Sequence, residues 1–170
     1  QTCALPISRL AEDVFVLWVH ADTNITNINE YVAAVRRAGP QNWKMGGTGS
    51  GQEDSLVTAM LEEAYGIKHT YVPYKGGGTV AKNLISGVVN STVNNPSEQI
   101  DYYNEGLSRP IAAFTPRRLR AFPQVPTFRD LGHNLVYFMQ RSVVAPAGIS
   151  EEARIFYEDI FKQVHLSPEW

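Results

Sequence analysis

Four glycines and two hydroxyl residues lie within one stretch of the chain, Gly46-Gly47-Thr48-Gly49-Ser50-Gly51. Glycine lets a backbone turn tightly and approach a ligand closely. Where such a turn opens a helix, free amide N–H groups and the positive end of the helix dipole point at one spot, which suits an anion. The Thr48 and Ser50 hydroxyls can donate to a carboxylate oxygen alongside these amides. The candidate ligand residues here are therefore Gly47, Thr48, Gly49, Ser50, Gly51 and Gln52.

Two further turns carry polar residues of the same kind. Tyr74-Lys75-Gly76-Gly77-Gly78 follows one expected strand, and Asn94-Asn95-Pro96-Ser97 follows the next. If these strands are parallel neighbours, all three turns emerge at one edge of the sheet, where ligands bind in such folds. This adds four candidates to the ligand site: Tyr74, Lys75, Asn94 and Asn95.

The elements that position these turns alternate between strand and helix. Apolar runs rich in β-branched and aromatic residues predict strands, and apolar residues at helical spacing predict helices. The alternation is typical of an α/β fold with a mostly parallel sheet. We expect strands at 14–20, near 43–45, and at 68–72, 88–93, 111–114 and 137–145, with helices from about 28 to 38, 52 to 65, 79 to 86, 96 to 105 and 150 to 164.

Composition excludes several classes of protein. The 170 residues are 44% hydrophobic and 19% charged, with a net charge of -2, so the chain lacks the basic face of a nucleic-acid binder. The sequence contains no run of 18 apolar residues, the length needed to span a bilayer. The stretch Gln1–Ile7, which contains the one cysteine, Cys3, resembles translated sequencing-adapter sequence and is left out of the functional reasoning.

The sequence lacks the usual motifs of nucleotide binding, nucleophilic catalysis and metal binding. The glycine turn matches neither the Walker A loop, nor the GxGxxG fingerprint, nor the G-x-S-x-G elbow. The four histidines show no metal-ligand spacing, so we expect no metal and no cofactor. Glu53 and Asp54 suit the first turn of a helix, where the dipole favours carboxylates. Lys75 can be a solvated side chain, Tyr74 a packing residue, and Asn94 and Asn95 turn formers instead of ligand contacts.

Several stretches in order resemble one family. They are Gly49-Ser50 at a helix start, Val72-Pro73-Tyr74-Lys75-Gly76-Gly77-Gly78, Pro123-Gln124-Val125-Pro126-Thr127-Phe128 with Leu131-Gly132, Ala145-Pro146-Ala147-Gly148, and Ser167-Pro168-Glu169-Trp170. From about Ser8 to Trp170 the chain is similar to the substrate-binding proteins of tripartite tricarboxylate transporters, also called TctC or Bug receptors.

The resemblance implies a type II periplasmic-binding-protein-like fold of two α/β lobes joined by two crossing strands. Residues 1–20 would hold the suspect leader and the first crossing strand, residues 21–140 the second lobe, and residues 141–170 the second crossing strand and the return to the first lobe. The resemblance also implies a periplasmic, non-enzymatic receptor that carries a small organic anion to membrane permease subunits without spanning the membrane itself. No signal peptide is visible, and we expect that truncation has removed it.

The chain also departs from the family pattern. The family's first-lobe glycine loop is absent, so we expect a fragment that binds ligand weakly or not at all. Many members have His at the position of Glu53, an acidic residue at Asn94 and Trp near Gln140. A neutral Asn94 favours a carboxylate ligand without an amino group. Two alternatives stay open: an α/β enzyme acting on a carboxylated or phosphorylated metabolite, and a sensory ligand-binding domain.

Overall fold

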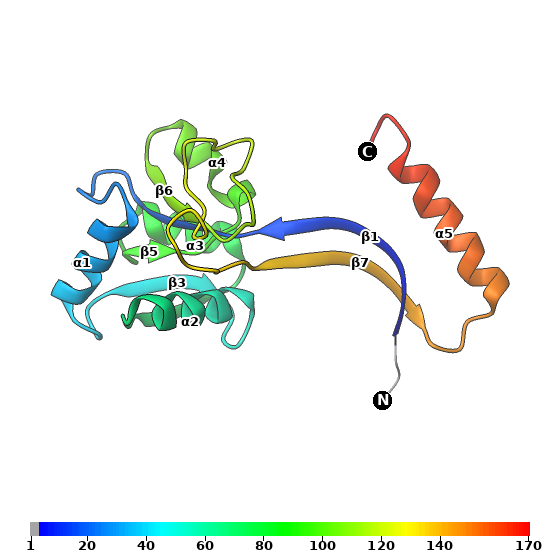
Figure 1. Cartoon of the computed structure of the whole chain (residues 1–170), viewed down its shortest axis with the longest axis horizontal. Coiled ribbons are helices and arrows are strands. Elements are labelled where there is room, and N and C mark those ends of the chain that lie inside the picture. Colours follow the sequence, from blue (N-terminus) through cyan, green and yellow to red (C-terminus); the bar gives the residue numbers. More distant parts are fainter. Residues whose placement is uncertain (1–3) are drawn as a thin grey trace. The chain divides into compact units, whose positions relative to one another are not determined.

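The computed structural model describes residues 4–170, so Cys3 and the first two residues lie outside the described part. The chain divides into two compact units, residues 14–138 and residues 4–13 with 139–170. Figure 1 labels the helices and strands of both units.

A five-stranded sheet forms the centre of the larger unit, in the order β4-β3-β5-β2-β6. Strand β3 pairs in parallel with both β4 and β5, while β2 runs antiparallel to both β5 and β6. Four strands therefore share one direction and β2 opposes them, which confirms the expected α/β fold with a mostly parallel sheet. The strands are β2 (Val16–His20), β3 (Lys44–Thr48), β4 (Thr70–Tyr74), β5 (Ser91–Thr92) and β6 (Ser108–Ala113).

Four helices connect these strands: α1 (Ile28–Ala38), α2 (Glu53–Tyr65), α3 (Gly77–Ile85) and α4 (Pro96–Asn104). Each boundary has a local cause. The Asn27 side chain accepts from the Glu30 amide and caps α1. Gly66 ends α2 in the left-handed conformation, and Pro96 occupies the first turn of α4, where its missing N–H costs nothing.

Strand β5 is shorter than the apolar run 88–93 predicts. The amides of Val88 and Val89 both donate to the carbonyl of Asn83, so these residues complete the end of α3 instead of pairing in the sheet. Only Ser91 and Thr92 pair with β2 and β3.

The core lies on β2. Its residues Val16, Leu17, Trp18 and Val19 are fully buried. The Trp18 ring packs edge-on against Tyr103 and Phe122, and its indole N–H donates to the carbonyl of Asn94. The position of β2 inside the sheet explains the continuous apolar run from Val14 to His20, because a strand buried on both faces needs no polar alternation.

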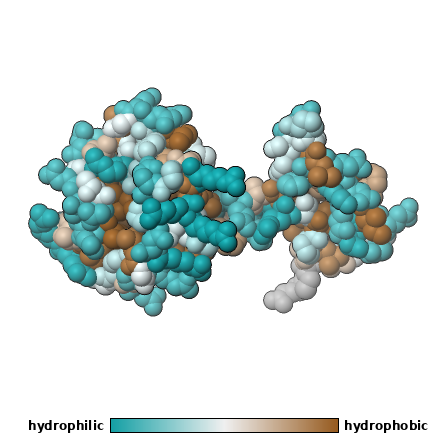
Figure 2. Space-filling model, turned by 45° about the horizontal axis from the view of Figure 1, so that its top comes forward, coloured by the Kyte–Doolittle hydropathy of each residue, from teal (hydrophilic) through white to brown (hydrophobic). Residues whose placement is uncertain are grey.

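The smaller unit holds a two-stranded sheet of β1 (Ala4–Val14) and β7 (Phe138–Pro146), followed by α5 (Glu151–His165). The Ser150 side chain caps α5 by accepting from the Ala153 amide. No residue of α5 is buried, and its apolar side chains Phe156 and Val164 are exposed. Figure 2 shows hydrophobic residues, in brown, on the surface among hydrophilic ones. None of the helices among residues 4–170 has the length and hydrophobicity of a membrane span.

The stretch 14–20 differs from its expected role as a crossing strand. Strand β1 ends at Val14, and β2 belongs to the sheet of the larger unit. The two-stranded sheet instead pairs β1 with β7, and β1 includes residues 4–7 of the stretch left out of the functional reasoning.

Candidate functional site

The three polar turns meet at the carboxyl ends of β3, β4 and β5. Thr48 at the end of β3 lies opposite Tyr74 at the end of β4, and the Gly49 amide donates to the Tyr74 carbonyl at 3.1 Å. The Asn94 side-chain amide donates to the Gly77 carbonyl at 2.9 Å, which ties the third turn to the second. The expected convergence of the turns at one sheet edge is therefore present.

The first turn needs glycine at two positions. Gly49 and Gly51 have φ of 51° and 75°, in the left-handed region that side chains disfavour. A Cβ on Gly49 would also lie 2.3 Å from the side-chain carbonyl carbon of Gln52, which lies over it. These glycines thus allow the chain to reverse directly before α2.

Amide donors without partners gather at this turn. The Thr48 amide donates to Asp54 Oδ2 at 2.8 Å and the Gly49 amide to Tyr74, so neither is free for a ligand. The amides of Ser50, Gly51 and Gln52 have no hydrogen-bond partner among the described residues, and α2 has no side-chain cap. Unpaired amides at a helix N-terminus form an anion-binding arrangement. Three of the candidate residues therefore offer a free amide, while Thr48 retains only its hydroxyl.

Three residues beneath the turn hold its shape. The Asp54 carboxyl is buried, with 5% of the residue exposed, and burial raises its pKa, although the Thr48 amide acts in the opposite direction. The Tyr71 hydroxyl donates to the Thr48 carbonyl at 3.0 Å. A Cβ on Gly47 would lie 2.3 Å from the Tyr71 hydroxyl and 2.8 Å from Asp54 Cβ. Gly47 is therefore required for packing beneath the turn.

The sequence patterns do not predict the contacts that Asp54 and Tyr71 make with the turn. Asp54 does lie in the first turn of α2, as expected, but it also bonds back to the preceding loop. A short acidic side chain directly after a glycine turn is the signal that indicates such a contact. Tyr71 carries no comparable signal, because its partner comes from the neighbouring strand.

The other four candidates differ in accessibility. Tyr74 is half-buried and packs against the core cluster around Trp18, whereas Lys75 is exposed. Asn94 is 2% exposed, and its side chain accepts from the Thr92 hydroxyl while donating to Gly77. Asn95 is half-buried and donates to the Val14 carbonyl. Both asparagine side chains thus make internal contacts.

The titratable groups in the described residues include no cluster of three that could hold a metal ion. His69 instead belongs to a chain of buried hydrogen bonds. Its ring contacts Glu62 Oε1 at 3.3 Å and the Tyr31 hydroxyl at 2.9 Å, and Tyr31 lies 3.0 Å from Ser91 Oγ. Burial lowers the pKa of His69, so its neutral form is favoured.

Residues 3–170 match the model of the tripartite tricarboxylate transporter family receptor, TctC. The chain belongs to this family. Because the family is one of substrate-binding receptors, the match supports a receptor and argues against the enzyme alternative. A UPF0065 protein in the gbd 5' region of Cupriavidus necator is 30% identical to this TctC chain over 164 residues, covering 96% of this chain and 50% of that relative. The TctC chain thus spans about half the length of this relative.

Solved structures show the same fold. An R. palustris protein with adipate superposes with a TM-score of 0.87 at 23% identity, covering 99% of this chain and 56% of that one. MatC from Rhodopseudomonas palustris with bound malate gives a TM-score of 0.86 at 19% identity, covering 97% and 56%. The TctC chain therefore has the fold of about half of these proteins.

Proposed function

We propose that this chain is the ligand-holding part of a periplasmic solute receptor, which binds a small organic carboxylate and delivers it to the permease subunits of a tripartite tricarboxylate-type transporter. The observation that carries the proposal is the set of unpaired amides at Ser50, Gly51 and Gln52. They lie at the positive end of the α2 dipole. Structural neighbours solved with adipate and malate support a carboxylate as the ligand.

One carboxylate of the ligand would lie at the first turn. The three amides donate to its oxygens, with the Thr48 and Ser50 hydroxyls as further donors and water completing the contacts. Lys75 adds a positive charge at the adjoining second turn. Binding follows closure of two lobes, which is an equilibrium that the ligand shifts.

The lobes of the receptor would divide this chain. The unit 14–138 corresponds to most of the proposed second lobe, 21–140, and β1 with β7 would connect it to the first lobe. The chain spans about half the length of its relatives, so the other half of the carboxylate clamp would come from the part that it does not contain. We therefore expect the chain alone to bind a dicarboxylate only weakly.

The Asn94 side chain is neutral and already bonded to Thr92 and Gly77, so it offers no partner for an ammonium group. This favours a ligand without an amino group. An acidic group does lie near the second turn: a Cβ on Gly77 would meet the Glu98 carboxyl carbon at 2.9 Å. Aspartate is therefore the decisive comparison with malate, since the two differ in an amino group and a hydroxyl.

Proline at position 53 provides a sharp test. Glu53 is the first residue of α2, and its amide adjoins those of Ser50–Gln52 and likewise has no hydrogen-bond partner among the described residues. Proline is tolerated at this position and removes that donor. Glu53→Ala is the matched control, because it removes the same carboxylate and keeps the amide. In a titration followed by two-dimensional NMR, malate and adipate should shift the amides of Ser50–Gln52 at millimolar concentrations, less in Glu53→Pro than in Glu53→Ala.

Three results would contradict the proposal. The first is that adipamide, the neutral analogue, produces the same shifts as adipate. The second is that Glu53→Pro and Glu53→Ala show equal shifts, and the third is that no saturable shift appears at these amides. Tighter binding of aspartate than of malate would refute the preference for a ligand without an amino group. A micromolar dissociation constant would refute the incomplete clamp.

A further inference from the structure

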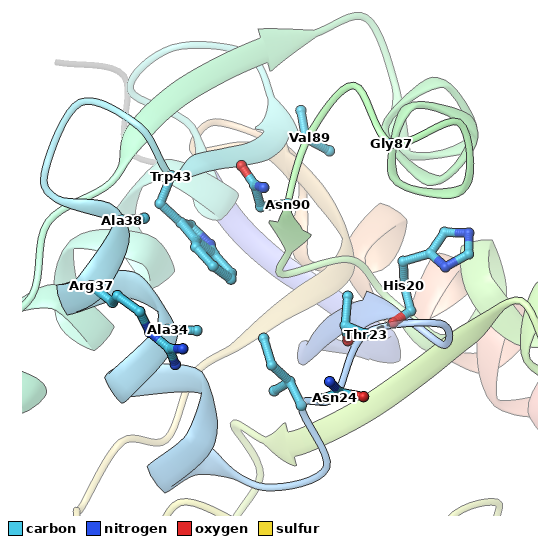
Figure 3. Close-up of a pocket in the computed structure, with 11 residues that line it drawn as sticks. His20, Thr23, Asn24, Ala34, Arg37, Ala38, Trp43, Gly87, Val89 and Asn90 are labelled. Atoms are coloured by element: carbon cyan, nitrogen blue, oxygen red, sulfur yellow. Dashed lines mark hydrogen bonds between the residues drawn. The ribbon is translucent and has the colours of Figure 1, made fainter.

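A pocket lies at the end of the sheet opposite the carboxylate turns. It has a volume of about 480 Å³ and is lined by residues that include Ile25, Ala34, Arg37, Trp43, Val89 and Asn90 (Figure 3). We call it the far-edge pocket. Trp43 precedes β3, Asn90 precedes β5, and His20 ends the antiparallel β2. The pocket is therefore at the amino ends of the parallel strands, whereas the carboxylate turns are at their carboxyl ends. Its volume lies within the range of small-molecule sites, roughly 300–1,000 Å³.

The inner part of the far-edge pocket is apolar. Trp43 is 8% exposed, and its indole N–H donates to Ser91 Oγ at 2.9 Å, which fixes the orientation of the ring. Ile25 and Val89 are also buried. The α1 positions facing this space carry Ala34 and Ala38, whose small side chains leave it open. Such a lining suits a planar or branched apolar group.

One wall of the far-edge pocket is held rigidly. Arg109 on β6 donates to the carbonyls of Ala21, Thr23 and Ile25 at 2.7–2.9 Å. The loop that follows β2 thus surrounds a guanidinium and keeps its position without a ligand. A preformed wall lowers the cost of ordering that binding otherwise carries.

The polar groups of the far-edge pocket are mainly donors. The Arg37 guanidinium has no hydrogen-bond or ion-pair partner among residues 4–170. Asn90 Oδ1 accepts from the Lys44 amide, which leaves its NH₂ group available. The His20 imidazole points away from Trp43 and Arg37 in Figure 3, and its Nδ1 accepts from the Asp22 amide. A cation and an amide donor around an apolar floor favour an anion with an apolar body.

We propose that the far-edge pocket is a second ligand site, which binds a small carboxylate with an apolar body separately from the carboxylate turn. The body lies against Trp43 and Ile25, and the carboxylate pairs with Arg37. This site is independent of the proposed receptor function, because it shares no residue with the turn at 48–52.

Phenylacetate is the probe, and phenylacetamide is its neutral analogue. In NMR titrations of the whole chain, phenylacetate should shift the Trp43 indole N–H and the Asn90 side-chain amide in a saturable way. Arg37→Gln should weaken this binding about tenfold, as the loss of one charge-assisted hydrogen bond does. Arg36→Gln, which removes a neighbouring charge bonded to the Tyr65 carbonyl, should leave it unchanged.

A second pair of variants tests the cavity itself. Ala34→Leu fills the far-edge pocket and should abolish binding, while Ala33→Leu, at an exposed neighbouring position, should not. Phenylacetamide should bind the unaltered chain about tenfold more weakly than phenylacetate. Three outcomes would overturn the proposal: shifts confined to the amides of Ser50–Gln52, equal binding of the two probes, or equal affinities of Arg37→Gln and Arg36→Gln. Arg37 is exposed, so its variant decides the question even if Ala34→Leu does not fold.

Discussion

Asp54 Oδ2 accepts a hydrogen bond from the Thr48 amide at 2.8 Å, so the first turn of α2 holds the loop that leads into it. This contact occupies the Thr48 amide and holds the glycine turn in place, so it also orients the amides that follow. The unpaired amides of Ser50, Gly51 and Gln52 thus stand on a loop braced from beneath by Asp54 and, through the Thr48 carbonyl, by Tyr71. The donors of the site are ordered before a ligand arrives.

Removing the carboxyl of Asp54 should destabilise the chain. Asp54→Ala leaves the Thr48 amide without its acceptor, and we expect the free energy of unfolding to fall by about 1–3 kcal/mol in urea denaturation. Asp54→Asn keeps an acceptor oxygen and should stay within about 1 kcal/mol of the unaltered chain. Equal losses in the two variants would contradict the role of Asp54 as an acceptor.

The pH dependence of the same pair gives an independent check. Burial raises the pKa of Asp54 above 3.8, so the carboxyl loses its proton less readily in the folded state than in the unfolded state. The free energy of unfolding therefore decreases as pH rises through the folded-state pKa. Asn carries no such penalty. The stability of Asp54→Asn relative to the unaltered chain should therefore increase as pH rises above about 4, measured by urea midpoints.

Gly47→Ala should be disruptive although Gly47 has an ordinary backbone conformation. The added Cβ would lie 2.3 Å from the Tyr71 hydroxyl and 2.8 Å from Asp54 Cβ. We expect a loss of about 1–3 kcal/mol in the free energy of unfolding, the usual cost of overpacking. Adding Tyr71→Phe to this variant removes the nearest atom and should recover part of the loss. Gly148→Ala is the control, because nothing lies within 4 Å of its added Cβ.

Much of this fold follows from local patterns in the sequence. Asn27 marks a helix start through its side chain and Gly66 a helix end through its left-handed backbone, and the apolar residues of α1 repeat at helical spacing. The glycine turn is equally local, since positive φ at Gly49 and Gly51 requires that residue type. Such features are predictable because cause and effect lie within a few residues.

The remaining features depend on partners distant in sequence. The apolar run at 14–20 indicates a buried strand but not its direction, and only its pairing with β5 and β6 makes β2 antiparallel. The same limit applies to Asn94, whose side chain contacts Gly77, and to the far-edge pocket, which four separate segments line. Periodicity and turn chemistry contain no information about these contacts.

Acid should destabilise the chain through His69. Burial lowers the pKa of His69 below 6.5, although Glu62 acts in the opposite direction. Below that pH the unfolded chain takes up a proton that the folded state resists, so the free energy of unfolding should decrease as pH falls below about 6.5. Urea midpoints between pH 8 and pH 5 measure this effect. His69→Gln should reduce the slope, whereas the exposed His165→Gln should keep it; equal slopes would contradict the assignment.

Arg109→Lys should also be costly. An ammonium on a lysine stem cannot reproduce the fork that reaches the carbonyls of Ala21, Thr23 and Ile25. We expect a loss of about 1.5–3 kcal/mol in urea denaturation, with faster hydrogen exchange in the loop 21–25. Arg129→Lys, which affects one exposed contact to Asn134, should change stability by less than about 0.5 kcal/mol. Similar effects of the two substitutions would exclude the proposed role of Arg109.

The position of β2 also determines when the larger unit can fold. Val16 pairs with Ala113, and Trp18 with Thr92, so the most apolar strand has no neighbour until most of the unit has been synthesised. Pairings at such long sequence separation close slowly, because the entropy of a large loop is lost before the contacts form. On the ribosome, the segment from Val16 to Val19 therefore stays unpaired for most of translation, and it is the part of the larger unit most in need of a chaperone.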